Sequence, residues 1–173
     1  MKSDQAYKHL AEGTDRAANN PNVITICIDL QQVLFCPTLT HSSVFYQRQL
    51  SCYNLGINNV GQRYSVMNLW NETIAKRGSA EIASCILKYI LDNFKPLEEN
   101  QERKLIVWSD RCVGQNNNWR ILTLYAYLVK QQYFTEVNQK FLCSGHSFLP
   151  CDRDFTLIER RKKVRAHSHE DES

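Results

Sequence analysis

The sequence lacks a long hydrophobic run. None of its apolar stretches reaches the roughly 18 consecutive residues that a membrane-spanning helix needs. It also lacks a basic and then apolar N-terminal leader, so we expect a protein that is not secreted. A strong charge of one sign is missing as well: the formal net charge is only +3, so the molecule as a whole gives no polyanion-binding signal. The length of 173 residues and the ordinary apolar content predict one globular domain with a core of its own.

Paired cysteines of the C-x-x-C type are also missing, although the chain holds seven cysteines. Their odd number and their positions inside apolar runs are typical of buried thiols in a reduced compartment, so we expect a nuclear or cytoplasmic protein. A structural zinc site is a weaker alternative, because its ligands would lack paired spacing. Those ligands would be Cys112, Cys143, His146 and Cys151. No spacing pairs a cysteine with a base, as a thiol nucleophile requires.

Short apolar runs separated by turn signals predict five strands and three helices between residues 22 and 163. The expected strands cover about 23–30, 44–55, 63–70, 104–110 and 136–143, with a turn over 56–61. The expected helices begin after a Ser79 N-cap, cover 119–133, and run from Pro150 to about residue 163. Residues 1–21 predict a polar leader, helical or disordered, and residues 164–173 a disordered charged tail.

This order of elements predicts an α/β fold with a mixed five-stranded sheet flanked by helices. A three-strand antiparallel meander comes first, followed by helix, strand, helix, strand and helix. The order resembles the ribonuclease H-like fold shared by retroviral-type integrases and DDE transposases. In that fold, catalytic acids lie on the first strand, at the end of the fourth strand and on the last helix. Asp29, Asp110 and Asp152 fall on those elements here.

Carboxylates at the ends of adjacent strands can converge, and converging carboxylates bind divalent metal. Asp29 and Asp110 each end an apolar run, and Asp152 lies in the first turn of the last helix. We therefore expect these three to be metal ligands and catalytic residues. The plainer alternatives are a turn-forming role for a strand-end aspartate and a helix-dipole role for Asp152.

Further side chains could assist the three aspartates. Glu159 lies seven residues after Asp152 and shares its helix face, whereas Asp154 points away and is expected to be exposed or paired with an arginine. His146 could bind metal or shuttle a proton, or simply be structural. Glu81, at a helix start, could add a carboxylate, although the helix dipole alone explains it.

Two polar segments are candidates for contact with phosphate groups. The loop after Asp110 is rich in amides, and Asn116 could hold a phosphate or orient a water molecule, although Asn118 could equally cap the following helix. The basic run near the C-terminus could hold backbone phosphates, or could be a solvated helix end. Its members are Arg160, Arg161, Lys162 and Lys163.

Several segments resemble an uncharacterised, transposon-derived domain family common in insects and other animals. They include Ile28-Asp29-Leu30-Gln31, Trp108-Ser109-Asp110 and the stretch 144–155, and the resemblance covers about residues 23–162. It implies a transposase-type domain whose N-terminal DNA-binding region is missing from this chain. The loop after Asp110 departs from the family pattern at Arg111, Val113-Gly114 and Asn117.

The expected function is that of a polynucleotidyl transferase or nuclease of transposase type, which acts on DNA phosphodiesters with two Mg²⁺ or Mn²⁺ ions. The alternative is a catalytically inactive, domesticated domain that binds nucleic acid or protein. The resemblance also allows a homo-oligomer.

Overall fold

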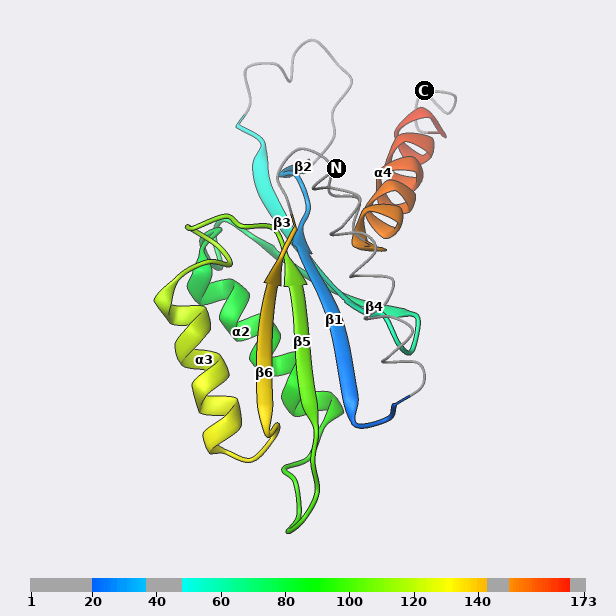
Figure 1. Ribbon diagram of the computed structural model, residues 1–173. Helices are drawn as coiled ribbons and strands as arrows, with labels where there is room; N and C mark the ends of the chain where they lie inside the picture. Colours follow the sequence, from blue (N-terminus) through cyan, green and yellow to red (C-terminus); the bar gives the residue numbers. More distant parts are fainter. Residues whose placement is uncertain (1–19, 37–47, 143–149, 169–173) are drawn as a thin grey trace.

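The computed structural model describes residues 20–36, 48–142 and 150–168, with side chains described for residues 151–161 in the last segment (Figure 1). Its elements, in chain order, are β1 (Val23–Leu30), β2 (Leu34–Cys36), β3 (Leu50–Asn59), β4 (Tyr64–Asn71), α2 (Ser79–Asn93), β5 (Lys104–Ser109), α3 (Trp119–Lys130), β6 (Glu136–Phe141) and α4 (Pro150–Ser168). The expected α/β class, with a mixed sheet flanked by helices, is confirmed.

All six strands belong to one mixed sheet. Strand β1 pairs antiparallel with β3 and parallel with β5; β3 pairs antiparallel with β4, and β5 pairs parallel with β6. Strand β2 continues the line of β1, because the pairing of β3 with β1 ends at Leu30↔Leu55 and resumes with β2 at Leu34↔Cys52. The order across the sheet is therefore β4-β3-β1-β5-β6.

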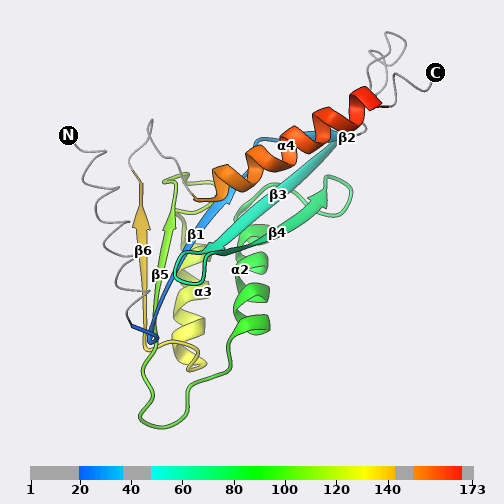
Figure 2. The same cartoon turned by 90° about the vertical axis from the view of Figure 1, so that its right-hand side faces the viewer.

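Helices α2 and α3 cover one face of the sheet, and α4 lies on the other (Figure 2). The alternation of side chains along β1 explains both layers. Ile26 and Ile28 are fully buried in the core beneath α2 and α3, whereas Cys27 belongs to a smaller cluster with Trp108 and Leu142. The core face of α2 has the expected helical spacing, with buried Ile82, Ile86, Tyr89 and Ile90.

Several expected boundaries were wrong. Strand β2 was missed because three residues are too few to give a periodic pattern. Strand β3 begins at Leu50 and runs through the expected turn to Asn59. Asn58 lies in the strand and donates to Ser65 Oγ, whereas Asn59 donates to Tyr89 Oη and its Oδ1 accepts from the Gln62 amide, so Asn59 ends the strand and shapes the turn that follows.

The helix ends also differ from expectation. Gly78, not Ser79, is the N-cap of α2 and provides no side-chain hydrogen bond. Helix α3 ends at Lys130 and β6 ends at Phe141, both earlier than expected. Helix α4 continues to Ser168, where basic side chains favour a helix C-terminus, so residues 164–168 are helical. The expected leader lies almost wholly outside the described residues.

None of the helices in the described part of the chain is both long and apolar enough to span a bilayer.

Candidate functional site

Asp29 and Asp110 occupy matching positions at the same end of two neighbouring parallel strands. The register of β1 and β5 runs from Val23↔Lys104 to Cys27↔Trp108, and two further residues bring Asp29 beside Asp110. Side chains two residues apart on a strand share a face, so both aspartates lie on the face of Cys27 and Trp108. That face is the one on which α4 lies.

Helix α4 approaches the sheet closely because β3 has a glycine beneath it. A Cβ atom at Gly56 would lie only 3.0 Å from Phe155 Cζ and 3.2 Å from Cys151 Cβ. Cys151 and Phe155 are both buried, and burying a phenylalanine side chain contributes about 1.5–3 kcal/mol. Gly56 is also the pairing partner of Asp29 in β1. The two anchors therefore fix the first turns of α4, and Asp152 with them, over the end of β1.

Asp29, Asp152 and Glu159 line one cavity of about 410 Å³, together with Gln31 and Thr156. The expected sharing of one helix face by Asp152 and Glu159 is confirmed. Thr156 donates a hydrogen bond to the backbone carbonyl of Asp152 at 2.8 Å.

The pKa of Asp29 reflects the negative charges of the other two aspartates. The pKa of Asp29 is raised from 3.8 to about 6; burial is the largest cause, and the negative charges of Asp152 and Asp110 also raise it. The Leu30 amide, which donates to Asp29 Oδ1 at 2.9 Å, and the positive charge of Arg77 act in the opposite direction. The charges of Asp152 and Asp110 thus both act on Asp29 at one end of the sheet.

This raised pKa predicts a pH dependence of stability in the metal-free protein. Between pH 3.8 and about 6 the folded state binds more protons at Asp29 than the unfolded state does, so the unfolding free energy falls as pH rises. Asp29→Asn removes this contribution. We therefore expect the unfolding free energy of the variant to exceed that of the wild type by an amount that grows from about pH 4 to about pH 7, up to about 3 kcal/mol. Urea unfolding of both proteins in EDTA measures the difference. Parallel pH curves for the two would contradict the raised pKa.

Asp110 is held by the loop that follows it. Asn116 Nδ2 donates to Asp110 Oδ1 at 2.5 Å, and the Cys112 amide donates to the same oxygen at 3.3 Å. Asn116 is 4% exposed, and among the described residues its Oδ1 has no hydrogen-bond partner. Asn116 therefore positions the Asp110 carboxylate in this structure, and its contact with a phosphate stays a prediction. Asn118 caps α3 by accepting from the Arg120 and Ile121 amides, as its alternative interpretation predicts.

A buried amide pair that the sequence interpretation missed supports Glu159. Gln31 Nε2 donates to Glu159 Oε1 at 3.1 Å, and Asn54 Nδ2 donates to Gln31 Oε1 at 2.9 Å. Gln31 and Asn54 are both buried. The one sequence signal was a pair of glutamines directly after an apolar strand, where buried amides need partners.

Asp154 points away from the Asp29 cavity, as expected. Its expected exposure or arginine pairing was wrong: it is half-buried, and among the described residues it accepts a hydrogen bond from Ser65 Oγ and forms no ion pair with an arginine. Glu81 accepts from the Lys76 amide at 3.2 Å and does not line the Asp29 cavity. Arg160 and Arg161 are exposed, whereas His146 and the side chains of Lys162 and Lys163 lie outside the described residues.

Cys27 and Cys151 are buried thiols, as expected, whereas Cys36, Cys52 and Cys85 are only half-buried. Cys151 packs against β1 and donates to the Cys27 carbonyl at 3.5 Å, and burial raises its pKa to about 12. Cys112 lies exposed in the loop after Asp110, and Cys143 lies outside the described residues. A thiol with a raised pKa is a poor metal ligand and a poor nucleophile.

Within the described ranges, no three His, Cys, Asp or Glu side chains come together closely enough to hold a metal ion. The donor chemistry at the Asp29 end of the sheet still fits a hard divalent cation, because Asp29, Asp110 and Asp152 offer only oxygen ligands. Their mutual repulsion, visible in the pKa of Asp29, opposes closer approach. A bound cation would neutralise that repulsion.

Comparison with known protein families gives one match, which covers most of the chain. Residues 42–171 match a family described as a domain of unknown function (DUF7869). The chain belongs to this family. The matched segment includes Asp110 and Asp152, and Asp29 precedes it. No curated protein and no solved structure matches the chain. The expected membership of an uncharacterised family is thus confirmed, whereas transposon origin and a distribution in insects stay predictions.

Proposed function

We propose that this DUF7869 protein is a divalent-metal-dependent polynucleotidyl transferase or nuclease of transposase type, which acts on DNA phosphodiesters. The observation that carries the proposal is the placement of three aspartates, from β1, from the end of β5 and from the first turn of α4, around one end of the sheet. Carboxylates in such a cluster are the ligands of two-metal phosphodiester chemistry.

The strand order supports a ribonuclease H-like fold as part of this proposal. The order β4-β3-β1-β5-β6, with antiparallel pairing among the first three and parallel pairing among the last three, agrees with the expected meander followed by alternating helices and strands. Transposon origin, a nuclear location and an N-terminal DNA-binding region on a longer protein belong to the same proposal.

Each side chain has a distinct role in the proposed chemistry. Asp29, Asp110 and Asp152 would hold Mg²⁺ or Mn²⁺, which when bound activates the attacking oxygen and stabilises the leaving oxygen. Asn116 keeps Asp110 oriented toward the site. Glu159, held by Gln31, faces the same cavity and can accept a proton from the attacking water or hydroxyl. The basic end of α4 would hold the phosphates of the substrate.

Nicking of supercoiled plasmid DNA tests this proposal. We expect the purified protein to convert supercoiled plasmid to the open circle in Mn²⁺ or Mg²⁺, and excess EDTA to stop the reaction, because the carboxylates need the cation to act. The absence of nicking with either metal, in a protein that circular dichroism finds folded, would contradict the enzyme proposal.

A catalytically inactive binding module is the second candidate. Two observations favour it. One carboxylate oxygen of Asp110 already accepts hydrogen bonds from Asn116 and Cys112, and no three His, Cys, Asp or Glu side chains of the described residues lie close enough to bind a metal ion. Arg111, beside Asp110, adds a positive charge at the same end of the sheet. This candidate predicts DNA binding without cleavage.

A further inference from the structure

A second and larger cavity lies on the opposite flank of α4 from the Asp29 cavity. It encloses about 780 Å³ between α4 and the hairpin of β3 and β4. Asp152, Thr156 and Glu159 face the Asp29 cavity, whereas Arg153, Leu157 and Arg161 line this groove. Helix α4 is therefore a wall shared by the two cavities.

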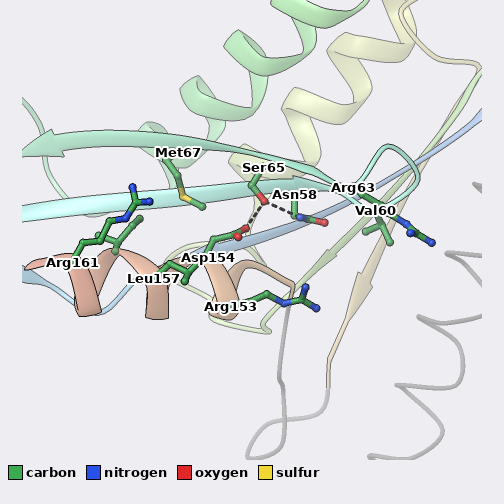
Figure 3. A pocket seen from close by; sticks show the side chains of 10 residues that line it. Asn58, Val60, Arg63, Ser65, Met67, Arg153, Asp154, Leu157 and Arg161 are labelled. Carbon is green, nitrogen blue, oxygen red and sulfur yellow. Dashed lines mark hydrogen bonds between the residues drawn. The ribbon is translucent and has the colours of Figure 1, made fainter.

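Three arginines border the groove. Arg153 and Arg161 are eight residues apart on α4, which corresponds to about 12 Å along a helix. Arg63 lies on the hairpin turn opposite, and Figure 3 shows Arg63 and Arg153 at one side of the groove and Arg161 at the other. All three are exposed, and the structure gives none of them an ion pair with a described residue.

The backbone at Arg63 adds a separate observation. Its φ of 56° lies in the left-handed region, where glycine or asparagine is the less costly residue for a turn. An arginine in this conformation costs more conformational energy than glycine or asparagine would at the same place. Such strain often accompanies a functional contact.

The floor of the groove differs from its rim. Val60, Met67, Leu157 and Ile158 provide apolar surface. In the centre, Asn58 donates to Ser65 Oγ at 2.7 Å, and Ser65 donates to Asp154 Oδ2 (Figure 3). Asp154 keeps further acceptor capacity, because an ionised carboxylate has about four lone-pair positions.

We propose that this groove binds unpaired nucleotides of a single-stranded DNA segment next to the reacting phosphodiester. Phosphates would lie against Arg63, Arg153 and Arg161, and bases would lie on the apolar floor. Asp154 would accept from an exocyclic amino group, as carboxylates do from cytosine N4. This inference rests on the proposed function for its DNA substrate, and it assigns Arg63, Arg153 and Asp154 roles beyond that function.

Salt-dependent binding tests the groove apart from catalysis. The probe is a fluorescein-labelled single-stranded oligonucleotide, and fluorescence anisotropy is measured in EDTA so that no cleavage occurs. We expect a triple variant to reduce the slope of the logarithm of the binding constant against the logarithm of the salt concentration by about 2, since each lost phosphate contact on a single strand removes about 0.7. Its substitutions are Arg63→Gln, Arg153→Gln and Arg161→Gln. The same change corresponds to about 100-fold weaker binding at about 0.1 M salt.

The matched control removes three positive charges from the other face. This control variant should leave the slope nearly unchanged. It combines three substitutions on α2 and α3: Lys88→Gln, Arg120→Gln and Lys130→Gln. Equal losses in the two triple variants, or no loss in the groove variant, would overturn the proposal. Absence of wild-type binding would overturn it too.

A pair of substitutions at one exposed position keeps the test independent of folding. Leu157 is 52% exposed and lines the groove. Leu157→Lys should tighten binding and Leu157→Glu should weaken it, whereas equal effects of the two would overturn the groove assignment. Wild-type binding without plasmid nicking would refute the enzyme but not the groove, and nicking with unaltered binding in the groove variants would refute the groove alone.

Discussion

Asp152→Asn is expected to lower metal-dependent plasmid nicking by about 1,000-fold, which corresponds to about 4 kcal/mol of lost transition-state stabilisation. Asparagine keeps the shape of the side chain but removes the negative charge that would hold the cation. Asp152 lines the Asp29 cavity, and its charge raises the pKa of Asp29. The nicking rate of each variant under saturating Mn²⁺ measures the effect.

The control for this prediction is Asp92→Asn. Asp92 lies on α2, is exposed, and among the described residues its ion pair is with Lys88 alone, so the nicking rate should stay within about twofold of wild type. A similar rate for Asp152→Asn and wild type would remove Asp152 from the chemistry. A similar loss in both variants would point to a general effect of charge.

The two strand-end aspartates could be predicted from the sequence because their signal is local. Each follows a short apolar run, and parallel pairing of the two runs is enough to bring Asp29 and Asp110 together. Asp152 could be predicted from the Pro150 helix start. These positions depend on strand ends and a helix start, which the sequence marks strongly.

The supporting residues could not be predicted, because their partners are distant in the chain. Gln31 meets Glu159 across 128 residues, and Ser65 meets Asp154 across 89. Gly56 was interpreted as part of a turn, yet its role is to let Phe155 and Cys151 approach β3. No periodicity encodes these contacts, since they arise only once α4 lies on the sheet.

The structure also explains why asparagines misled the placement of the hairpin. Asn58 and Asn59 favour turns in isolation, but both lie in β3, and only Asn59 contributes to a turn, by accepting from the Gln62 amide. The turn covers residues 60–63 and includes Arg63. One consequence is that the groove beside α4 was invisible from the sequence, because Arg63 belonged to an expected strand.

Calorimetric titration with Mn²⁺ tests most directly whether the three aspartates form a cation site. We expect the wild type to bind Mn²⁺ and Asp110→Ala to lose that binding, since one of the proposed ligands is gone. The control is Glu81→Ala, because the Glu81 carboxylate accepts a hydrogen bond from the Lys76 amide outside the Asp29 cavity. This variant should bind Mn²⁺ as the wild type does.

The same titration should depend on pH, because a ligand must be deprotonated to bind metal. With the pKa of Asp29 raised to about 6, affinity should rise as pH passes through that value. Binding that is strong at neutral pH, weaker in acid and absent in Asp110→Ala is the result that the carboxylate site predicts. Absent binding in the wild type, or equal binding in Asp110→Ala, would contradict it.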